Sequence, residues 1–564
     1  MVTKRILILA SLLILLALRG HGAAEEPHKA VFNIFTYKGT QPPANGYGFF
    51  IGADGTGIAS YSLFRDADRA EIIDARGNKY PVVRILGASS QYDLVKFRAD
   101  CRRTTEFLRP ATQPTSAGGT LQLINYSASK KALPTGVKVE KASPYGSYKY
   151  YDVSVANNER NFGCPLLNSQ GEVVAIVQKT MSPSAKNASA IDARFTDTLR
   201  IRSTGAFSSD LRSIKIPKAL PDNIQDALAF IYMMNQDESR EAIAAYDDFI
   251  QTYPDNAEGY VNRATYYGSH GNYPLCEADF ETALRQATHP SSTITEDGIR
   301  HAYSRLIYNQ LTAKPAPTTC PWTLDQALQQ ALTAYDINPN PLYLLQAGHC
   351  YYAKQDYEAA FQAYKRVNQT DFATPETFLS AAQALEQGGA DPLQVLEQLD
   401  SAITRLDKPY NVQGAQYLYV HALQAIKCER FREAALDLIE YEKVITPNRL
   451  SHQFYYDREQ TERRAKMYQQ ALDDIRTAEA RSERPQYYLY LLEESSLLLQ
   501  VGMYDEAIAT SEALLKELPD NPDAYKIMGL AYGEKKQKAK AREMLEKAAQ
   551  LGDPDADALT QKYQ

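Results

Sequence analysis

The chain has 564 residues, of which 61 are lysine or arginine and 68 are aspartate or glutamate, a formal net charge of −7. This acidic balance argues against broad binding of nucleic acid or of anionic membrane surfaces. The length allows two to four domains, and the six cysteines are sparse and lack the spacing of metal ligands, so we expect neither a metal site nor a cofactor.

The amino terminus has the order of a secretory signal. Two basic residues precede an apolar run of 13 residues from Ile6 to Leu18, which is too short to span a bilayer comfortably. Small residues follow up to Ala24, so we expect residues 1–23 to be removed and the mature chain to be exported. The alternative is an uncleaved anchor. Because no second apolar run of spanning length follows, no stable membrane insertion is expected.

Residues 28–202 have the pattern of a β domain. Short β-branched and aromatic runs, separated by turn residues, predict strands at 31–37, 48–51, 70–73, 80–85, 94–97, 121–124, 138–140, 150–155 and 172–177. Many short strands with frequent turns indicate a β-barrel or a sandwich.

Residues 203–220 contain glycine, serine and proline and are predicted to be a linker between two separately folding domains.

Residues 221–564 have a helical pattern that repeats. Small side chains recur at spacings of 33 to 37 residues, in the pairs Ala242 and Cys276, Ala327 and Ala360, Ala434 and Ala471, and Ala507 and Ala541. After all of these residues except Ala507, an apolar or aromatic residue follows four positions later, as Tyr364 follows Ala360. This resembles the tetratricopeptide repeat, a helix pair of about 34 residues that is stable only when stacked into a solenoid. We expect about nine helix pairs, some of them degenerate, with an insertion near 287–320; the alternative is an irregular helical array.

Three segments of the β domain share motifs with one family. They are Gly46-Tyr47-Gly48-Phe49-Phe50-Ile51 with Asp54-Gly55-Thr56-Gly57-Ile58 after it, Tyr92-Asp93-Leu94-Val95-Lys96-Phe97, and Asn161-Phe162-Gly163-Cys164-Pro165-Leu166 with Gly171-Glu172-Val173-Val174-Ala175-Ile176. These segments resemble the trypsin-like serine proteases, most closely the Do-like (HtrA-like) bacterial branch. The resemblance implies an all-β double barrel of the chymotrypsin fold, followed here by the all-α solenoid.

The same resemblance implies that the catalytic machinery is lost. The family's histidine falls on Ser62, its nucleophilic serine on Phe162 and the glycine of its oxyanion hole on Arg160, while its aspartate is retained as Asp93. No histidine lies between residues 30 and 201. Since a serine hydroxyl is a poor nucleophile without a neighbouring base, we expect a pseudoprotease in which Phe162 is buried and fills the old nucleophile pocket, while Arg160 crowds it.

Cys164 and His270 offer two other routes to catalysis. Cys164 lies two residues beyond the nucleophile position, but a thiolate needs a nearby cation, which the domain does not offer. A histidine of the solenoid, such as His270, would have to extend to the β domain to act as the base there. The alternative function is therefore an active trypsin-like endopeptidase with a non-standard site.

We expect instead a non-catalytic scaffold or adaptor. The family's groove takes an extended peptide by strand addition, which needs no catalytic atoms, and a solenoid adds a concave surface. His349 and Tyr352, three residues apart on one helix, are the candidate contacts on that surface. The expected partners are other envelope proteins or peptide segments in the periplasm of a Gram-negative-type bacterium; a third possibility is that the barrel only caps the solenoid.

Overall fold

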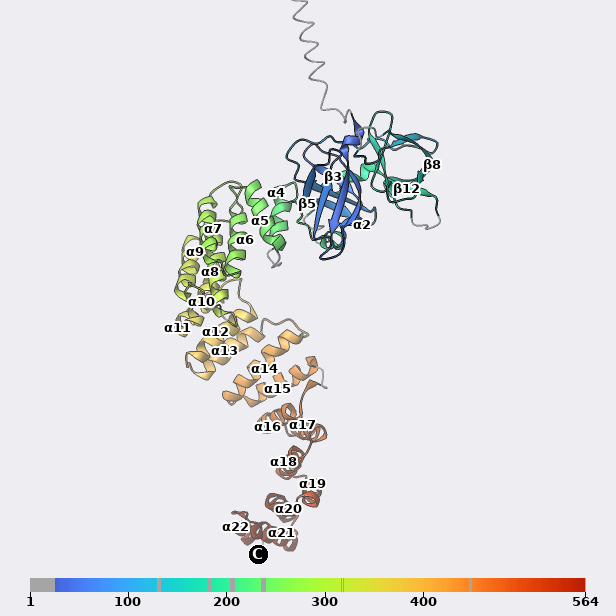
Figure 1. The fold of residues 1–564 in the computed structure, drawn as a ribbon. Coiled ribbons are helices and arrows are strands. Elements are labelled where there is room, and N and C mark those ends of the chain that lie inside the picture. The colour runs from blue at the N-terminus through green and yellow to red at the C-terminus, as the bar shows by residue number, and fades with distance from the viewer. Residues whose placement is uncertain are drawn as a thin grey trace, which may run out of the picture. The chain divides into compact units, whose positions relative to one another are not determined.

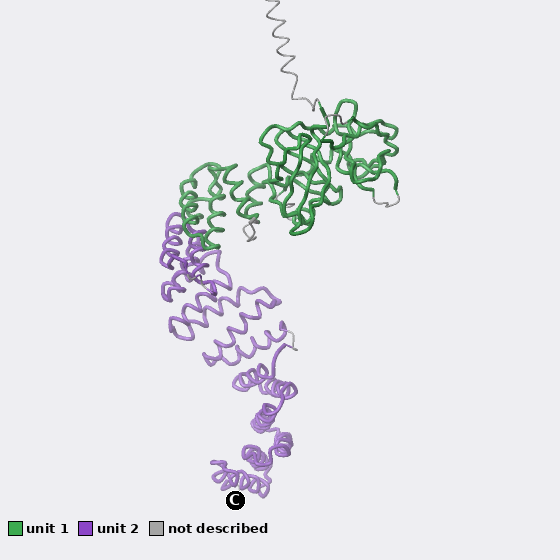
Figure 2. The backbone as a smooth tube through the Cα atoms, viewed as in Figure 1, with its two compact units in different colours: residues 1–299 green, residues 300–564 purple. Residues whose placement is uncertain are grey.

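The computed structural model describes residues 26–128, 133–180, 185–202, 208–234, 240–315, 317, 319–445 and 449–562 (Figure 1). The predicted signal segment and residues 203–207 of the predicted linker lie outside these ranges. The chain divides into two compact units, residues 1–299 and residues 300–564 (Figure 2).

The β domain consists of two closed antiparallel barrels of six strands each. The first has the strand order β1-β2-β3-β6-β5-β4, with β1(Val31–Tyr37), β2(Ala44–Phe50), β3(Thr56–Ala59), β4(Arg69–Ile73), β5(Lys79–Ser89) and β6(Leu94–Ala99). The second has the order β10-β11-β12-β9-β8-β7, with β7(Thr120–Leu123), β8(Thr135–Tyr145), β9(Tyr148–Ala156), β10(Pro165–Leu167), β11(Val173–Gln178) and β12(Asn187–Asp192). This arrangement confirms the predicted double barrel of the chymotrypsin type.

All nine predicted strands are present, and the sequence missed β3, β10 and β12. The missed strands are short, and β12 is built largely from Asn187, two alanines and Ser189, which carry little β propensity. Five of its six residues are nevertheless buried. Small side chains suit the crowded interior of a closed barrel, so burial and pairing with β9 and β11 make this segment a strand where local propensity does not.

The core of the first barrel continues into the first helices of the solenoid. One cluster of buried side chains joins Phe32 and Phe97 of the barrel to Ile214 and Ile216 of the predicted linker, and to Phe230 of α4(Ile224–Met234). Residues 208–220 are therefore packed against the barrel through these buried isoleucines.

Two ion pairs accompany this packing. The Arg84 guanidinium donates hydrogen bonds of 2.6 and 2.7 Å to both carboxylate oxygens of Asp248 on α5(Arg240–Thr252). The buried Lys218 ammonium lies 3.0 Å from each carboxylate oxygen of Glu241 on the same helix. The predicted domain boundaries stay a prediction, and so does the independent folding of residues 221–564, of which α4 and α5 share this core with the first barrel.

The rest of the described chain is helical. After α4 and α5 come α6(Ala257–Ser269), α7(Tyr273–Gln286), α8(Glu296–Thr312), α9(Leu324–Ile337), α10(Pro341–Ala353), α11(Tyr357–Val367), α12(Pro375–Gln387), α13(Pro392–Ile403), α14(Val412–Lys427), α15(Phe431–Val444), α16(His452–Arg464), α17(Tyr468–Arg481), α18(Gln486–Gln500), α19(Tyr504–Glu517), α20(Pro522–Glu534), α21(Lys538–Gln550) and the short α22(Ala556–Gln561). From α4 to α21 the described chain has 18 helices, and the predicted number of nine repeat pairs stays a prediction. The predicted insertion at 287–320 contains α8, so it is part of this series.

The repeat pattern has a direct packing cause. The eight small anchors named from the sequence, from Ala242 to Ala541, are all fully buried. Gly348 on α10 shows why a small residue is required: a Cβ there would lie 2.7 Å from the Tyr364 ring on α11. Asparagine–proline pairs start α10 and α20: in α10, Asn340 accepts a hydrogen bond from the Leu342 N–H ahead of Pro341. The solenoid predicted from the sequence is confirmed.

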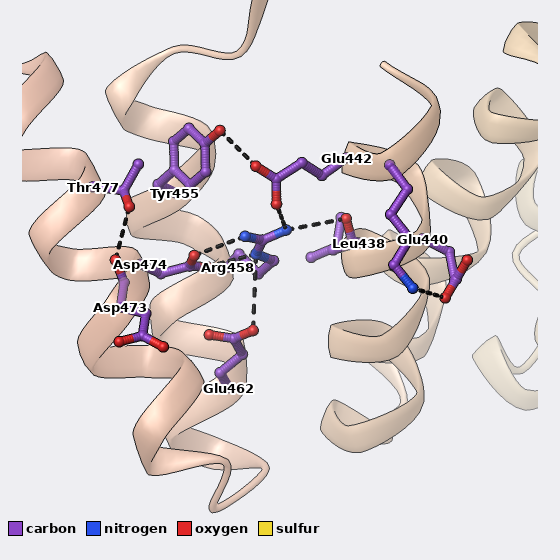
Figure 3. A network of polar contacts seen from close by, with 10 residues as sticks. Leu438, Glu440, Glu442, Tyr455, Arg458, Glu462, Asp473, Asp474 and Thr477 are labelled. Carbon is purple, nitrogen blue, oxygen red and sulfur yellow. Dashed lines mark hydrogen bonds and ion pairs between the residues drawn. The ribbon is translucent and has the colours of Figure 1, made fainter. Parts of the chain in front are cut away.

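A buried polar network lies among α15, α16 and α17 (Figure 3). The Arg458 side chain on α16 donates two hydrogen bonds to Asp474 on α17 and contacts Glu442 on α15 at 2.7 Å. The Tyr455 hydroxyl donates to the same Glu442 carboxylate at 2.7 Å. Glu462 lies one turn along α16 from Arg458 at 3.8 Å. One cation thus holds together carboxylates from three consecutive helices.

Candidate peptide-binding clefts

The first unit contains an open cleft of about 660 Å³ at the predicted site. It brings together Ser62 of the short helix α2(Tyr61–Phe64), Asp93 just before β6, and Phe162 of the loop before β10. The other lining residues are Asn45, Gly46, Ser60, Leu63, Asn157, Asn158, Glu159, Lys179 and Thr180. Three of the four degenerate positions named from the sequence therefore share one cleft.

Asp93 and Ser62 are joined by two hydrogen bonds. The Ser62 N–H donates to one Asp93 carboxylate oxygen at 2.7 Å, and the Ser62 hydroxyl donates to the other at 3.4 Å. Burial raises the pKa of Asp93, and the hydrogen bonds from Ser62 oppose that rise. Asp93 also has a positive φ of 46°. The aspartate fixes the start of α2 and has a hydroxyl, not an imidazole, as its partner.

The loop that carries Phe162 is held against the first barrel at Gly163. This glycine has φ +80°, and a Cβ there would lie 2.1 Å from the Tyr47 carbonyl oxygen, so no larger residue fits. Phe162 itself is half-buried and packs with Tyr47 and Ala142 against the core of the second barrel. The expectation that Phe162 is buried was wrong, because one side of its ring forms part of the wall of an open cleft.

Arg160 does not crowd the cleft as expected. Its side chain is exposed and is not among the lining residues. Its N–H donates to the Asn158 side-chain oxygen at 3.1 Å. Since this N–H already has an acceptor within its own turn, it is not free to stabilise an oxyanion.

The two residues considered for an alternative mechanism have structural roles. Cys164 is fully buried, and burial raises the pKa of its thiol to about 12. Its sulfur has the Arg160 carbonyl oxygen at 3.6 Å as an acceptor. His270, at the end of α6, stacks on Tyr266 with ring centroids 4.0 Å apart and does not line the cleft. Neither group provides a base or a thiolate at this site.

In the second unit, His349 and Tyr352 take part in packing between helices. The His349 Nδ1 lies 3.0 Å from the Tyr364 hydroxyl, and burial lowers the pKa of the imidazole. The Tyr352 ring lies edge-on to Tyr357 at 5.4 Å. Both side chains are half-buried, and their assignment to ligand binding stays a prediction.

Sequence reasoning missed a second cleft, of about 550 Å³, formed by α14, α15 and α16. Tyr419 and Leu423 line it and remain 38% and 44% exposed. Their spacing of four residues places them on one face of α14. The same spacing is typical of residues that pack between repeats, so the sequence alone does not mark these two as exposed.

Within the described ranges, no group of three or more His, Cys, Asp or Glu side chains is arranged to hold a metal ion. No helix in the described part of the chain is long and apolar enough to cross a membrane.

Comparisons with known proteins agree with this two-part architecture. A tetratricopeptide repeat model matches residues 226–256. A probable periplasmic serine endoprotease, DegP-like, from Rhizobium meliloti (strain 1021) is 28% identical over 161 residues, which are 26% of this chain and 30% of that protein. An HtrA-type protease, AlgW, in a variant solved with a tripeptide, aligns at 15% identity with a TM-score of 0.27, covering 32% of this chain and 61% of that chain.

The matched stretch spans less than a third of the DegP-like protein and under two thirds of the AlgW chain. The chain combines a double barrel of the chymotrypsin type, similar over part of its length to a DegP-like protein, with a helical solenoid that includes a tetratricopeptide repeat.

Proposed function

We propose that the chain is a non-catalytic, exported adaptor that binds polypeptide segments at the barrel cleft and along the solenoid. The observation that carries this proposal is the hydrogen-bonded pair of Ser62 and Asp93 opposite Phe162 in an open cleft. Peptide hydrolysis by this type of site needs a base and a nucleophile, and these positions hold a hydroxyl and a phenyl ring. Degenerate triad positions at Ser62, Asp93 and Phe162 are part of the proposal.

The lining of the cleft suits an extended peptide. The side chains of Asn45, Asn157 and Asn158 offer amide donors and acceptors, which match the main-chain groups of a bound segment. Leu63 and Phe162 add apolar surface for a side chain. Binding of this kind uses shape and main-chain hydrogen bonds and requires no reacting group.

A second role of the barrel is favoured by the shared core. Because Phe230 and Ile214 are buried in the same cluster as Phe32, the first barrel covers the apolar end of the helical series. Terminal repeats need such a cover to stay soluble. This capping role is compatible with peptide binding, since the cleft residues lie outside that cluster, apart from the partly buried Leu63 at its edge.

Location and partners follow from the relatives and the repeats. The DegP-like relative is described as periplasmic, and tetratricopeptide repeats generally mediate protein–protein interaction. We infer export by a cleaved signal at residues 1–23 and partners among envelope proteins or their peptide segments. Mass spectrometry of the native amino terminus tests the signal, and a retained Met1 would contradict it.

The catalytic part of the proposal is tested with a fluorophosphonate probe and a casein turnover assay on the purified chain. We expect no labelling and no turnover above background, and Asp93→Ala should leave both readouts unchanged. Labelling of a serine, or turnover that disappears in Cys164→Ala, would show that the chain is an enzyme.

The binding part is tested by photo-crosslinking. A photo-reactive phenylalanine analogue in place of Phe162 should capture unfolded casein, whereas the same analogue in place of the exposed Arg76 on the first barrel should not. Equal capture at both positions would show that the cleft has no role in binding.

A further inference from the structure

The cleft among α14, α15 and α16 has a wall of large apolar side chains. Tyr419, Leu423 and Ile426 come from α14, Phe431 and Leu438 from α15, and Phe454 from α16. The rings of Tyr419 and Tyr441 are 5.2 Å apart, and those of Tyr441 and Phe454 are 5.7 Å apart. A row of tilted rings in contact thus joins α14 to α16 across α15. Ligands usually bind in concave, mostly apolar clefts of this kind.

Two charged residues line this cleft, Asp457 and Arg464, both exposed on α16. Asp457 accepts a hydrogen bond of 2.8 Å from Gln453, and the Arg464 guanidinium lies over the Phe431 ring at 5.2 Å. In the described part of the chain, neither has an ion pair with an opposite charge within 4.0 Å.

The other arginines of α16 behave differently. Arg458 pairs with Asp474, and Arg463 pairs with Glu493 at 3.2 Å. Arg464 is the one arginine of this helix whose guanidinium faces the cleft without a carboxylate, although the chain as a whole is acidic. A guanidinium can bind a carboxylate by donating two parallel hydrogen bonds to its oxygens.

The distance between the two charged residues limits which peptides can contact both of them. Asp457 and Arg464 are seven positions apart, which corresponds to about 10 Å along a helix axis. In an extended chain of the polyproline II type, residues three apart lie on the same side at about 9 Å. An acidic and a basic side chain three residues apart would therefore meet Arg464 and Asp457 together, with the residues between them over the apolar wall.

We propose that this cleft binds an extended peptide segment in which an acidic and a basic residue are separated by two apolar residues. The proposal rests on the proposed adaptor function and specifies the chemistry of one of its binding sites. Arg464 holds the acidic residue, Asp457 holds the basic one, and Tyr419, Leu423 and Phe454 contact the apolar pair.

The test uses the full chain and fluorescein-labelled peptides, with fluorescence polarisation as the readout. The probe is Gly-Glu-Leu-Leu-Lys-Gly; one comparison peptide has lysine in place of the glutamate, and another has serines in place of the leucines. We expect each comparison peptide to bind about ten- to a hundredfold more weakly, because each loses a charge-assisted contact or its apolar contact. Equal binding of the three peptides would overturn the proposal.

Charge reversal in the protein gives the sharper result. Arg464→Glu should weaken binding of the glutamate peptide about tenfold or more and make the lysine-substituted peptide the better ligand. Arg542→Glu on α21 is the matched control, since it reverses an exposed arginine of another repeat, and it should change neither affinity. An Arg464→Glu chain that keeps the wild-type order of affinities would contradict the assignment.

Two further outcomes separate this proposal from the proposed function. Cleavage of the bound peptide would end the non-catalytic proposal and leave the cleft assignment standing. Absence of peptide binding, together with a dimer by sedimentation that Leu423→Asp converts to monomer, would assign the cleft to a second copy of this chain. That result would overturn the peptide proposal and leave the crosslinking test at Phe162 to decide the adaptor function.

Discussion

Arg458 on α16 donates hydrogen bonds of 2.5 and 2.7 Å to the two carboxylate oxygens of Asp474 on α17, and both side chains are buried. The same guanidinium also contacts Glu442 and lies near Glu462 (Figure 3). A single positive charge is therefore shared among several carboxyl groups in the interior of the second unit, so its removal leaves them uncompensated.

Arg458→Ala should lower the free energy of unfolding of the second unit by about 3–5 kcal/mol, the usual cost of leaving buried partners unpaired. Urea unfolding followed by circular dichroism measures this loss. Arg542→Ala removes an exposed arginine and should change the free energy by no more than about 0.5 kcal/mol. Equal stability of the two variants would mean that the network contributes nothing.

Glu459, a neighbour of Arg458 on α16, makes stability depend on pH. Its side chain is fully buried, one of its oxygens has no hydrogen-bond partner in the described chain, and burial raises its pKa to about 7. Arg463 lowers this pKa and Glu493 raises it, as smaller effects. The folded chain keeps the proton between the unfolded value of 4.5 and about 7, so stability falls as pH rises through that window.

Glu459→Gln removes this titration and keeps the size of the side chain. The variant should be more stable than the wild type above pH 7, by up to about 3 kcal/mol, and the difference should shrink toward pH 4.5. Thermal melts across pH 4.5–8 test this expectation. A difference that stays constant with pH would show that Glu459 is ionised throughout in the folded chain.

Phe230→Ala tests the shared core of the first unit. Loss of a buried aromatic side chain typically costs about 3–5 kcal/mol, and Phe230 belongs to the cluster that includes Phe32 and Phe97. Hydrogen exchange should therefore accelerate both in α4–α6 and in β1–β6. Phe378→Ala, in a buried cluster of the second unit, should leave the barrel strands unaffected. Acceleration confined to the helices in Phe230→Ala would show that barrel and helices fold separately.

Phe162→Ser restores a hydroxyl at the predicted nucleophile position without a base, because Ser62 remains opposite it. We expect no fluorophosphonate labelling. Since the ring is only half-buried, the cost in stability should be about 1–2 kcal/mol, less than for a buried aromatic side chain. A melting temperature equal to that of the wild type would indicate that the ring packs on nothing. Labelling of the new serine would mean that another group serves as its base.

Much of the fold could be predicted because its signals are local. Strands such as β1 are runs of β-branched and aromatic residues, and the small anchors from Ala242 to Ala541 mark places where helices approach closely. The core that joins Ile214 and Ile216 to the barrel could not be found in this way. Those residues lie in a segment with linker composition, and only contacts with residues far away in the sequence bury them.

The candidate sites could likewise be predicted only in part. Motif spacing placed Ser62, Asp93 and Phe162 together, since the strand geometry of a double barrel brings these positions into one cleft, but it could not show that the Phe162 ring is half exposed. The sequence could not single out Asp457 and Arg464, because only the residues around a charged side chain in the fold show whether it has an ion-pair partner.

The shared core of the first unit also has a mechanical consequence. A flexible tether absorbs extension by straightening, whereas packed isoleucines and the ion pairs of Arg84 and Lys218 resist it. A pull on α4–α6 by a bound partner would reach the first barrel as strain on these contacts. The segment that contains Ile214 and Ile216 is therefore a stiff connection between the first barrel and α4, not a flexible tether.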